Sequence, residues 1–215
     1  MTEVKKNAQK KIEALWKFSK VPFYVWCDIV ENIQECAKFY KSLIGKDFIF
    51  TLENNVKFKL YFKSSNFHHL LGLGKLTDIK GVWNGNPSNV FKKILDGQIS
   101  IETVEKSTKY YKIANRVKHF EKTTDMLDKE KSKIIIDFNR DLVSGTELIN
   151  TKYILYRDIS LYDEGIGGYA NLTIGEKQNK IYPETFFYEA SKKYISEQIL
   201  LDIIDIEVRK PNRKR

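Results

Sequence analysis

Two adjacent histidines, His68 and His69, are the side chains of this sequence best suited to proton transfer. They lie within residues 66–76, an otherwise apolar segment that follows a lysine-bearing strand pattern. The unperturbed pKa of histidine lies closest to neutral, so an imidazole can act as a general acid or base near pH 7. Neighbouring residues of a helix point about 100° apart, so we expect only one of the two to face a shared site. A histidine beside apolar residues is also common as an ordinary core or surface group, and that alternative stays open.

Three cations are candidates for holding a phosphate group beside these histidines: Lys59, Lys75 and Arg157. Lys59 alternates outward on its expected strand, so simple exposure to solvent explains it equally well. No set of His, Cys, Asp and Glu residues has the spacing of a metal site. No Gly-Lys-Ser/Thr sequence indicates a nucleotide-binding loop. We therefore expect neither a metal nor another cofactor.

The elements that must position these residues follow from hydrophobic periodicity. Residues 48–62 alternate on both sides of Asn54-Asn55, which predicts a hairpin with Phe48, Phe50, Phe58 and Phe62 buried. Spacings of three and four predict helices, and we expect them over residues 3–19, 23–44, 89–95 and 109–128, with a short apolar segment at 67–76. We expect further strands at residues 133–138, 152–157, 168–174 and 204–209. Helices first, then a hairpin, a helical insertion and a strand meander predict an antiparallel α+β fold.

The charge is unevenly distributed. The chain has 37 basic and 28 acidic residues in 215, for a net charge of +9. Residues 1–20 and 207–215 each carry +4, so the tails are basic around a nearly neutral body. Basic tails can hold phosphates without sequence preference, or serve only solubility. Within the body, segment 41–75 has six lysines against two acidic residues, so we expect one basic face.

The cellular setting is predicted from what the sequence lacks. The lysine-rich start is not followed by an apolar segment, and no uncharged stretch is long enough to span a bilayer. We therefore expect a cytoplasmic protein with no membrane partner. Cys27 and Cys36 are expected roughly 13 Å apart on one helix, beyond disulfide reach, as reduced core thiols. His119, on the charged helix 109–128, is expected at the surface.

Two short motifs carry a resemblance to a known group of nucleases. Residues 39–46 and the hairpin lead into Phe67-His68-His69-Leu70-Leu71-Gly72, and Tyr182-Pro183-Glu184-Thr185-Phe186 follows late in the chain. This order resembles the phage and mobile-element branch of the barnase–EndoU–colicin E5/D–RelE-like (BECR) nuclease superfamily. The branch pairs an aromatic-x-His-Leu-Leu-Gly element after the first hairpin with a Tyr-Pro-x-Ser/Thr-Phe element.

The resemblance implies a BECR-like α+β fold and metal-independent RNA cleavage. In that chemistry the ribose 2′-OH attacks the adjacent phosphate and leaves a 2′,3′-cyclic phosphate. His69 matches the motif histidine and is the expected proton-transfer group, and Thr185 matches the hydroxyl position that would donate to a phosphate oxygen. Tyr182 is expected to stack on a base or to bond the phosphate, although a core role explains it too, as a plain strand position explains Thr185. The second histidine of EndoU-like members is not evident, unless His68 serves.

From these residues we predict an endoribonuclease that acts as a toxin or in phage–host conflict. The predicted catalytic residues are His69, Thr185 and Lys75, and the predicted substrate-binding residues are Lys59, His68, Arg157 and Tyr182. The alternatives are an inactive RNA- or protein-binding module of the same fold, and a protein controlled by an antitoxin or immunity protein. We expect residues 1–37 to be a basic helical appendage, residues 38–209 the nuclease domain and residues 210–215 a basic tail.

Overall fold

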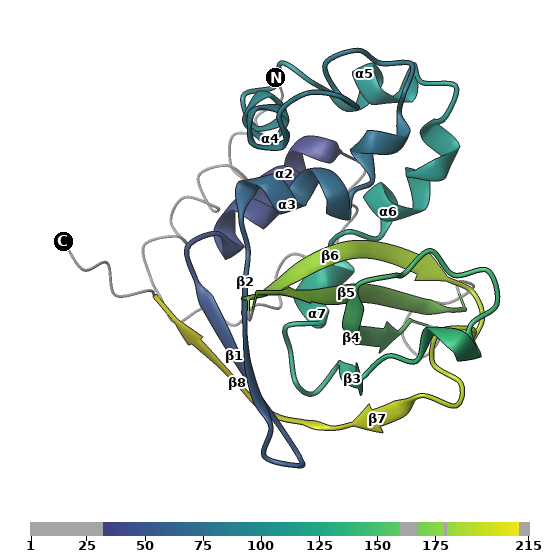
Figure 1. Cartoon of the computed structure of the whole chain (residues 1–215). Coiled ribbons are helices and arrows are strands. Elements are labelled where there is room, and N and C mark those ends of the chain that lie inside the picture. The colour runs from purple at the N-terminus through teal and green to yellow at the C-terminus, as the bar shows by residue number, and fades with distance from the viewer. Residues whose placement is uncertain (1–31, 160–166, 179, 211–215) are drawn as a thin grey trace.

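Among the described residues, the α-helices all precede residue 126, and the strands all follow it except for those of one early hairpin (Figure 1). The computed structural model describes residues 32–159, 167–178 and 180–210. The helices are α2 (Ile33–Leu43), α3 (Ser64–Leu70), α4 (Pro87–Leu95), α5 (Ile101–Glu105), α6 (Ala114–Lys118) and α7 (Lys122–Asp125), with 3-10 turns η2 (Leu73–Lys75), η3 (Tyr110–Lys112) and η4 (Arg140–Leu142). The strands are β1 (Asp47–Leu52), β2 (Lys57–Tyr61), β3 (Lys133–Ile136), β4 (Thr151–Asp158), β5 (Tyr169–Lys177), β6 (Lys180–Glu189), β7 (Ile199–Leu201) and β8 (Ile203–Arg209).

The strands form two antiparallel sheets. One has the order β2-β1-β8, and the other has the order β6-β5-β4-β3-β7. In Figure 1 helices α2 to α6 gather above the five-stranded sheet, α7 lies beside the strands of that sheet, and the β1–β2 hairpin runs alongside it. The predicted α+β class with helices followed by antiparallel strands is confirmed.

The β1–β2 hairpin links the two sheets through stacked aromatic rings. Alternation buries Phe48, Phe50, Phe58 and Phe62, as predicted, and Asn55 takes a positive φ in the turn. The Phe58 ring stacks on Phe50 at a centroid distance of 4.8 Å and on Tyr153 of β4 at 4.9 Å. Burial of large aromatic side chains is a major source of folding free energy, so these stacked rings help to fix the hairpin against the five-stranded sheet.

Helix α2 is part of the main hydrophobic core. Asn32 caps it by accepting a bond from the Gln34 N–H at 2.9 Å. The Tyr40 ring contacts Phe62, Phe67, Phe91 and Phe120, and so joins the hairpin to three further segments. The boundary expected after residue 37 falls inside this helix, whose buried residues Ile33, Cys36 and Ala37 precede it. Cys36 is a free, buried thiol as expected, whereas Cys27 and the helix at 3–19 lie outside the described residues.

The prediction of one long helix over residues 109–128 is wrong. The segment divides into η3, α6 and α7, separated by turns. The breaks fall at Ile113 and at residues 119–121. The β-branched Thr123 and Thr124, poor helix formers, come directly after the second break. The Thr124 hydroxyl donates to the Glu121 carbonyl at 2.6 Å, which competes with helical bonding. The division into short helices also allows Ile113, Val117 and Phe120 all to be buried.

Strands β6 and β7 were not among the predicted strands. In β6 the alternation is interrupted near Pro183, where the register with β5 shifts between Thr173 and Ile174. A proline is tolerated at the edge of a sheet or at a bulge, and β6 is an edge strand.

None of the described helices has both the length and the apolar character needed to cross a bilayer.

Candidate active site

The His-Leu-Leu-Gly motif ends helix α3 and makes room for an arginine. Gly72 adopts a positive φ of 72°, and its N–H donates to the His69 carbonyl at 3.0 Å. A Cβ at position 72 would lie 3.4 Å from the Arg116 side chain and 3.3 Å from Ile113. The glycine therefore supplies both the left-handed backbone that stops the helix and the close approach of Arg116.

The Tyr-Pro-x-Thr-Phe motif is the irregular part of edge strand β6. Pro183 and Phe186 are both buried although they lie three residues apart, because the shifted register breaks the two-residue alternation. Glu184 accepts a hydrogen bond from the Thr151 hydroxyl at 2.7 Å. Thr185 is held by its neighbour on β5, since its N–H donates to Thr173 Oγ1 at 3.0 Å.

Arg116 of α6 connects the two motifs. Its Nη1 donates to Thr185 Oγ1 at 2.6 Å and, in a longer bond of 3.4 Å, to the Leu70 carbonyl at the end of α3. Helices α3 and α6 both pack against β6, which places the guanidinium between them. Among the described residues, the hydrogen bonds of Arg116 are made by Nη1, and Nε and Nη2 make none. A guanidinium has five N–H donors, so those atoms remain available to an anion.

The surroundings of Arg116 carry surplus positive charge. Burial lowers the pKa of Arg116, and the Glu147 carboxylate partly opposes this. Burial also lowers the pKa of Lys75, and the positive charges of Arg116 and Lys112 add to the effect, against Glu147. Three cations near one carboxylate favour the binding of an anion, because an anion relieves their mutual repulsion.

The two histidines of the motif occupy different environments. His68 is buried, and its Nε2 lies 2.8 Å from the Val82 carbonyl, so it carries the proton there. Burial lowers the pKa of His68, which favours a neutral core histidine. His69 is exposed on the last turn of α3, next to Leu70, and within the described residues its imidazole makes no hydrogen bond. The two adjacent imidazoles therefore differ in exposure, and that at most one of them faces a shared site stays a prediction.

Thr185 and Tyr182 lie on β6 with part of their side chains exposed. The Thr185 hydroxyl accepts from Arg116 and, within the described part of the chain, has no acceptor for its own proton. It is therefore oriented to donate to an added oxygen. Tyr182 lies across from Gly175 of β5, and its partial burial and Glu184 raise the pKa of its hydroxyl.

Arg157 is placed as a structural residue rather than at an anion site. It is 6% exposed and pairs through Nη1 with Asp125 of α7. Lys131 also reaches Asp125, at 3.1 Å. This geometry fits an internal ion pair that ties β4 to α7, so we leave Arg157 out of the proposed site.

Removing one partner of this buried pair should destabilise the fold. We expect Arg157→Ala to lower the free energy of unfolding by about 3 kcal/mol, because Asp125 loses its buried cation. Denaturant titration of the full chain measures the change. Arg140→Ala, at an exposed position, is the control and should stay within about 0.5 kcal/mol of the wild type. If Arg157→Ala has unchanged stability but binds RNA more weakly, Arg157 contacts the substrate instead.

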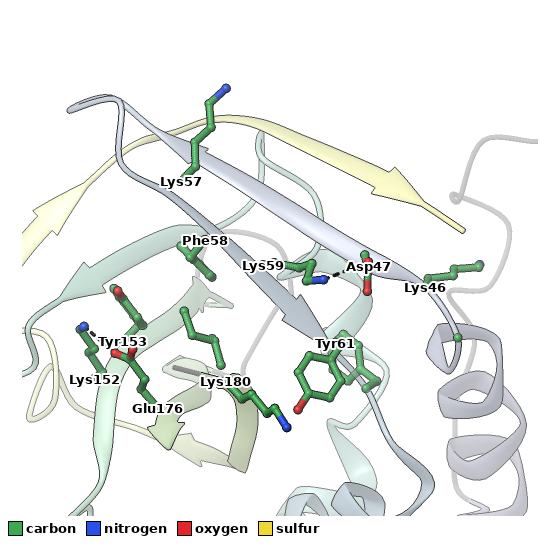
Figure 2. A pocket seen from close by; sticks show the side chains of 13 residues that line it. Lys46, Asp47, Lys57, Phe58, Lys59, Tyr61, Lys152, Tyr153, Glu176 and Lys180 are labelled. Carbon is green, nitrogen blue, oxygen red and sulfur yellow. Dashed lines mark hydrogen bonds and ion pairs between the residues drawn. The ribbon is translucent and has the colours of Figure 1, made fainter. Parts of the chain in front are cut away.

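Lys59 lies apart from Arg116, in a separate cleft between the hairpin and the five-stranded sheet (Figure 2). It is exposed and pairs with Asp47 at 3.3 Å. The cleft has a volume of about 730 Å³ and is lined mainly by residues of β1, β2, β4 and β6. The structure therefore brings Lys75, Thr185 and the end of α3 together around Arg116, but not Lys59.

Gly72 offers a direct test of how the site is assembled. We expect Gly72→Ala to cost about 1–2 kcal/mol of stability, since an L-residue is strained at this φ and its Cβ would lie 3.3 Å from the Ile113 side chain. Thermal unfolding measures this cost. Gly74→Ala is the matched control, because its Cβ would make only an ordinary contact with His68. Equal stability of the two variants would contradict the structural role assigned to Gly72.

Sequence reasoning missed Arg116 and misplaced His119. Only six of the 37 basic residues are arginines, and an arginine where lysine predominates could have indicated a need for forked hydrogen bonds. The prediction that His119 lies at the surface is wrong. His119 is 5% exposed and stacks on Tyr188 at a centroid distance of 5.0 Å.

Among the described residues, no three His, Cys, Asp or Glu side chains are grouped to hold a metal ion.

The fold is that of a nuclease of the BECR type. A family model described as phage-Barnase-EndoU-ColicinE5/D-RelE like nuclease 4 matches residues 32–204, which is most of the chain. The chain therefore belongs to that nuclease family. No curated protein and no solved structure shows a significant match to it. The match begins one residue before α2 and ends within β8.

Proposed function

We propose that this nuclease is an endoribonuclease that cleaves RNA by attack of a ribose 2′-OH on the adjacent phosphate. The observation that carries the proposal is the bridge made by Arg116. Its guanidinium joins the Leu70 carbonyl of the histidine motif to the Thr185 hydroxyl of the second motif, 115 positions later. The bridge leaves N–H and O–H donors unused, and it is anchored at the residue that directly follows the exposed His69. Donors to the phosphate oxygens and a proton-transfer group are what the transition state of phosphodiester cleavage requires.

The roles of the groups follow from their chemistry. Arg116 and Lys75 would neutralise the charge that develops on the non-bridging phosphate oxygens, and Thr185 would donate a hydrogen bond to one of them. His69 would transfer a proton, either from the attacking 2′-OH or to the departing 5′-oxygen. The group that completes the acid–base pair is not assigned by these contacts. Tyr182 remains a proposed contact for a base or phosphate.

The biological context is also a proposal. An endoribonuclease of this family would act in the cytoplasm as a toxin or in phage–host conflict, and an antitoxin or immunity protein would be its natural partner. Support comes from the family's own description, which names phage together with colicin E5/D and RelE. We propose that residues 38–209, together with the start of helix α2 at Ile33, perform the cleavage. We propose further that the basic residues before α2 and at 210–215 add affinity for RNA or for that partner.

Incubation of the purified full chain with total RNA tests the proposal. We expect cleavage of RNA but not of DNA, because DNA lacks the 2′-OH, and we expect equal rates with and without EDTA. Heat-denatured protein controls for contaminating ribonuclease only in part, so His69→Ala prepared identically is the second control. Intact RNA under all conditions would contradict the proposal and favour a non-catalytic module of the same fold.

A further inference from the structure

The cleft between the β1–β2 hairpin and the five-stranded sheet has more positive charge than its ion pairs use. Five lysines line it, against the two carboxylates of Asp47 and Glu176. Both carboxylates are already paired, with Lys59 at 3.3 Å and with Lys152 at 2.6 Å. The three remaining lysines make no ion pair among the described residues. They are Lys46, Lys57 and Lys180.

These three lysines lie at separate points around the rim of the cleft. The Lys57 amine points outward in Figure 2, and its charge helps to lower the pKa of Glu207 on β8. Lys57 begins β2 near the turn of the hairpin, and Lys46 precedes β1 at the opposite end. Lys57 and Tyr61 stand four residues apart on β2, which at about 3.3 Å per residue is about 13 Å. The cleft edge formed by β2 is therefore at least that long. Lys180 comes from the facing strand β6, and Figure 2 shows its amine beside Tyr61. Cations at this separation suit a chain of phosphates better than a single phosphate group.

The electrostatic environment at one end of the cleft indicates unsatisfied positive charge. Burial lowers the pKa of Lys46, and the neighbouring charge of Lys210 lowers it further. An anion placed between them would reverse this effect. Charge alone does not distinguish one polyanion from another, so a second feature of the cleft is needed.

That second feature is an aromatic side chain at the cleft. Tyr61 is partly exposed at the end of β2, with the Lys63 amine 5.1 Å from its ring centroid. The other cleft tyrosine, Tyr153, is buried against Phe58. A partly exposed ring beside spaced cations is typical of surfaces that bind single-stranded nucleic acid, where bases stack on the ring and phosphates contact lysines.

We propose that this cleft binds the single-stranded part of the RNA substrate at a distance from the cleaved phosphate. The inference deepens the proposed endoribonuclease function. Strand β6 carries Lys180 at the cleft and Thr185 at the Arg116 cluster, five positions apart. Those five positions correspond to about 16 Å. One extended RNA strand that runs along β6 therefore contacts both the cleft and the Arg116 cluster.

A binding measurement with an uncleavable probe tests the cleft without requiring catalysis. The probe is a labelled, unstructured 2′-O-methyl RNA oligonucleotide, whose blocked 2′-oxygen excludes the proposed reaction. We expect the full chain with Lys46→Ala, Lys57→Ala and Lys180→Ala to bind it more weakly. The slope of log affinity against log salt should fall by about 2, at roughly 0.7 for each lost phosphate contact.

A charge-matched variant controls for net charge. Lys92→Ala, Lys93→Ala and Lys106→Ala remove three exposed lysines of α4 and the end of α5, away from the cleft. This variant should keep the wild-type slope. Tyr61→Ala should weaken binding about five- to hundredfold through lost stacking, and Tyr61→Phe should restore it.

The outcomes separate this inference from the proposed function. An equal loss of oligonucleotide affinity in both lysine variants, or no loss in either, would overturn the cleft as an RNA site. The positive charge of the cleft would then be assigned to binding an acidic protein partner. An unchanged affinity of Tyr61→Ala would overturn the single-stranded assignment. If the wild-type protein cleaves no RNA but the cleft variant binds the oligonucleotide more weakly than the wild type does, the endoribonuclease proposal is contradicted. The same result still supports RNA binding in the cleft.

Discussion

Replacing His69 by alanine should lower the rate of RNA cleavage by about 10²–10⁴-fold, the usual contribution of one general acid or base. His69 is the exposed member of the histidine pair, and it precedes the residue whose carbonyl accepts a bond from Arg116. Its imidazole makes no hydrogen bond within the described part of the chain, so its removal should leave the fold intact. Single-turnover cleavage and circular dichroism of the same preparation measure both effects.

His68→Gln is the matched control for this prediction. The His68 imidazole is buried and bonds the Val82 carbonyl, and the glutamine amide retains a donor for that oxygen. We expect this variant to lose some stability while keeping most of its cleavage rate per folded molecule. A His69→Ala protein of full activity, or a His68→Gln protein that folds but has lost cleavage, would reverse the assignment of the two histidines.

Replacing Arg116 by lysine should lower cleavage by about 10²–10³-fold, although the positive charge is kept. A lysine amine cannot reproduce the planar fork that holds Thr185 and the Leu70 carbonyl and still presents free N–H groups to a phosphate. The expected loss is that of one preorganised donor to a developing oxyanion. We expect kcat to fall more than the affinity for substrate.

A neighbouring lysine and a double variant sharpen this second test. Lys118→Ala, on the same helix and exposed, should leave cleavage unchanged. If Arg116 acts partly by orienting the Thr185 hydroxyl, then Arg116→Lys and Thr185→Val should combine less than additively, since both remove one interaction. Strictly additive losses would show that the bridge has no part in catalysis, and an active Arg116→Lys protein would show that charge alone suffices.

The parts of the fold that local periodicity determines could be predicted from the sequence. The hairpin over residues 48–62 and helix α4 correspond to clear periods of 2 and 3.6 with turn residues at their ends. Residues 109–128 have helical spacing, but the chain breaks at Ile113 and at residues 119–121, where Ile113, His119 and Phe120 are buried, and it forms short helices. Strand β6 was missed because Pro183 and the register shift hide its alternation.

The candidate site was predictable only as separate motifs. His69, Lys75 and Thr185 could be proposed from short patterns, because those patterns fix local turns and strand ends. Arg116 could not, because its role depends on contacts with residues 46 and 69 positions away. Tertiary packing also decided the environment of His68, Arg157 and His119, whose burial is not evident from their immediate neighbours.

The chemistry of the cleaved ends tests the central claim most directly. RNA cut by the wild-type full chain in the presence of EDTA should carry 2′,3′-cyclic phosphates and 5′-hydroxyls, and these ends should disappear with His69→Ala. Mapping both ends of the products establishes their identity. Products with 5′-phosphates and 3′-hydroxyls, or cleavage that stops when EDTA is added, would contradict a 2′-OH transesterification at the Arg116–Thr185 site.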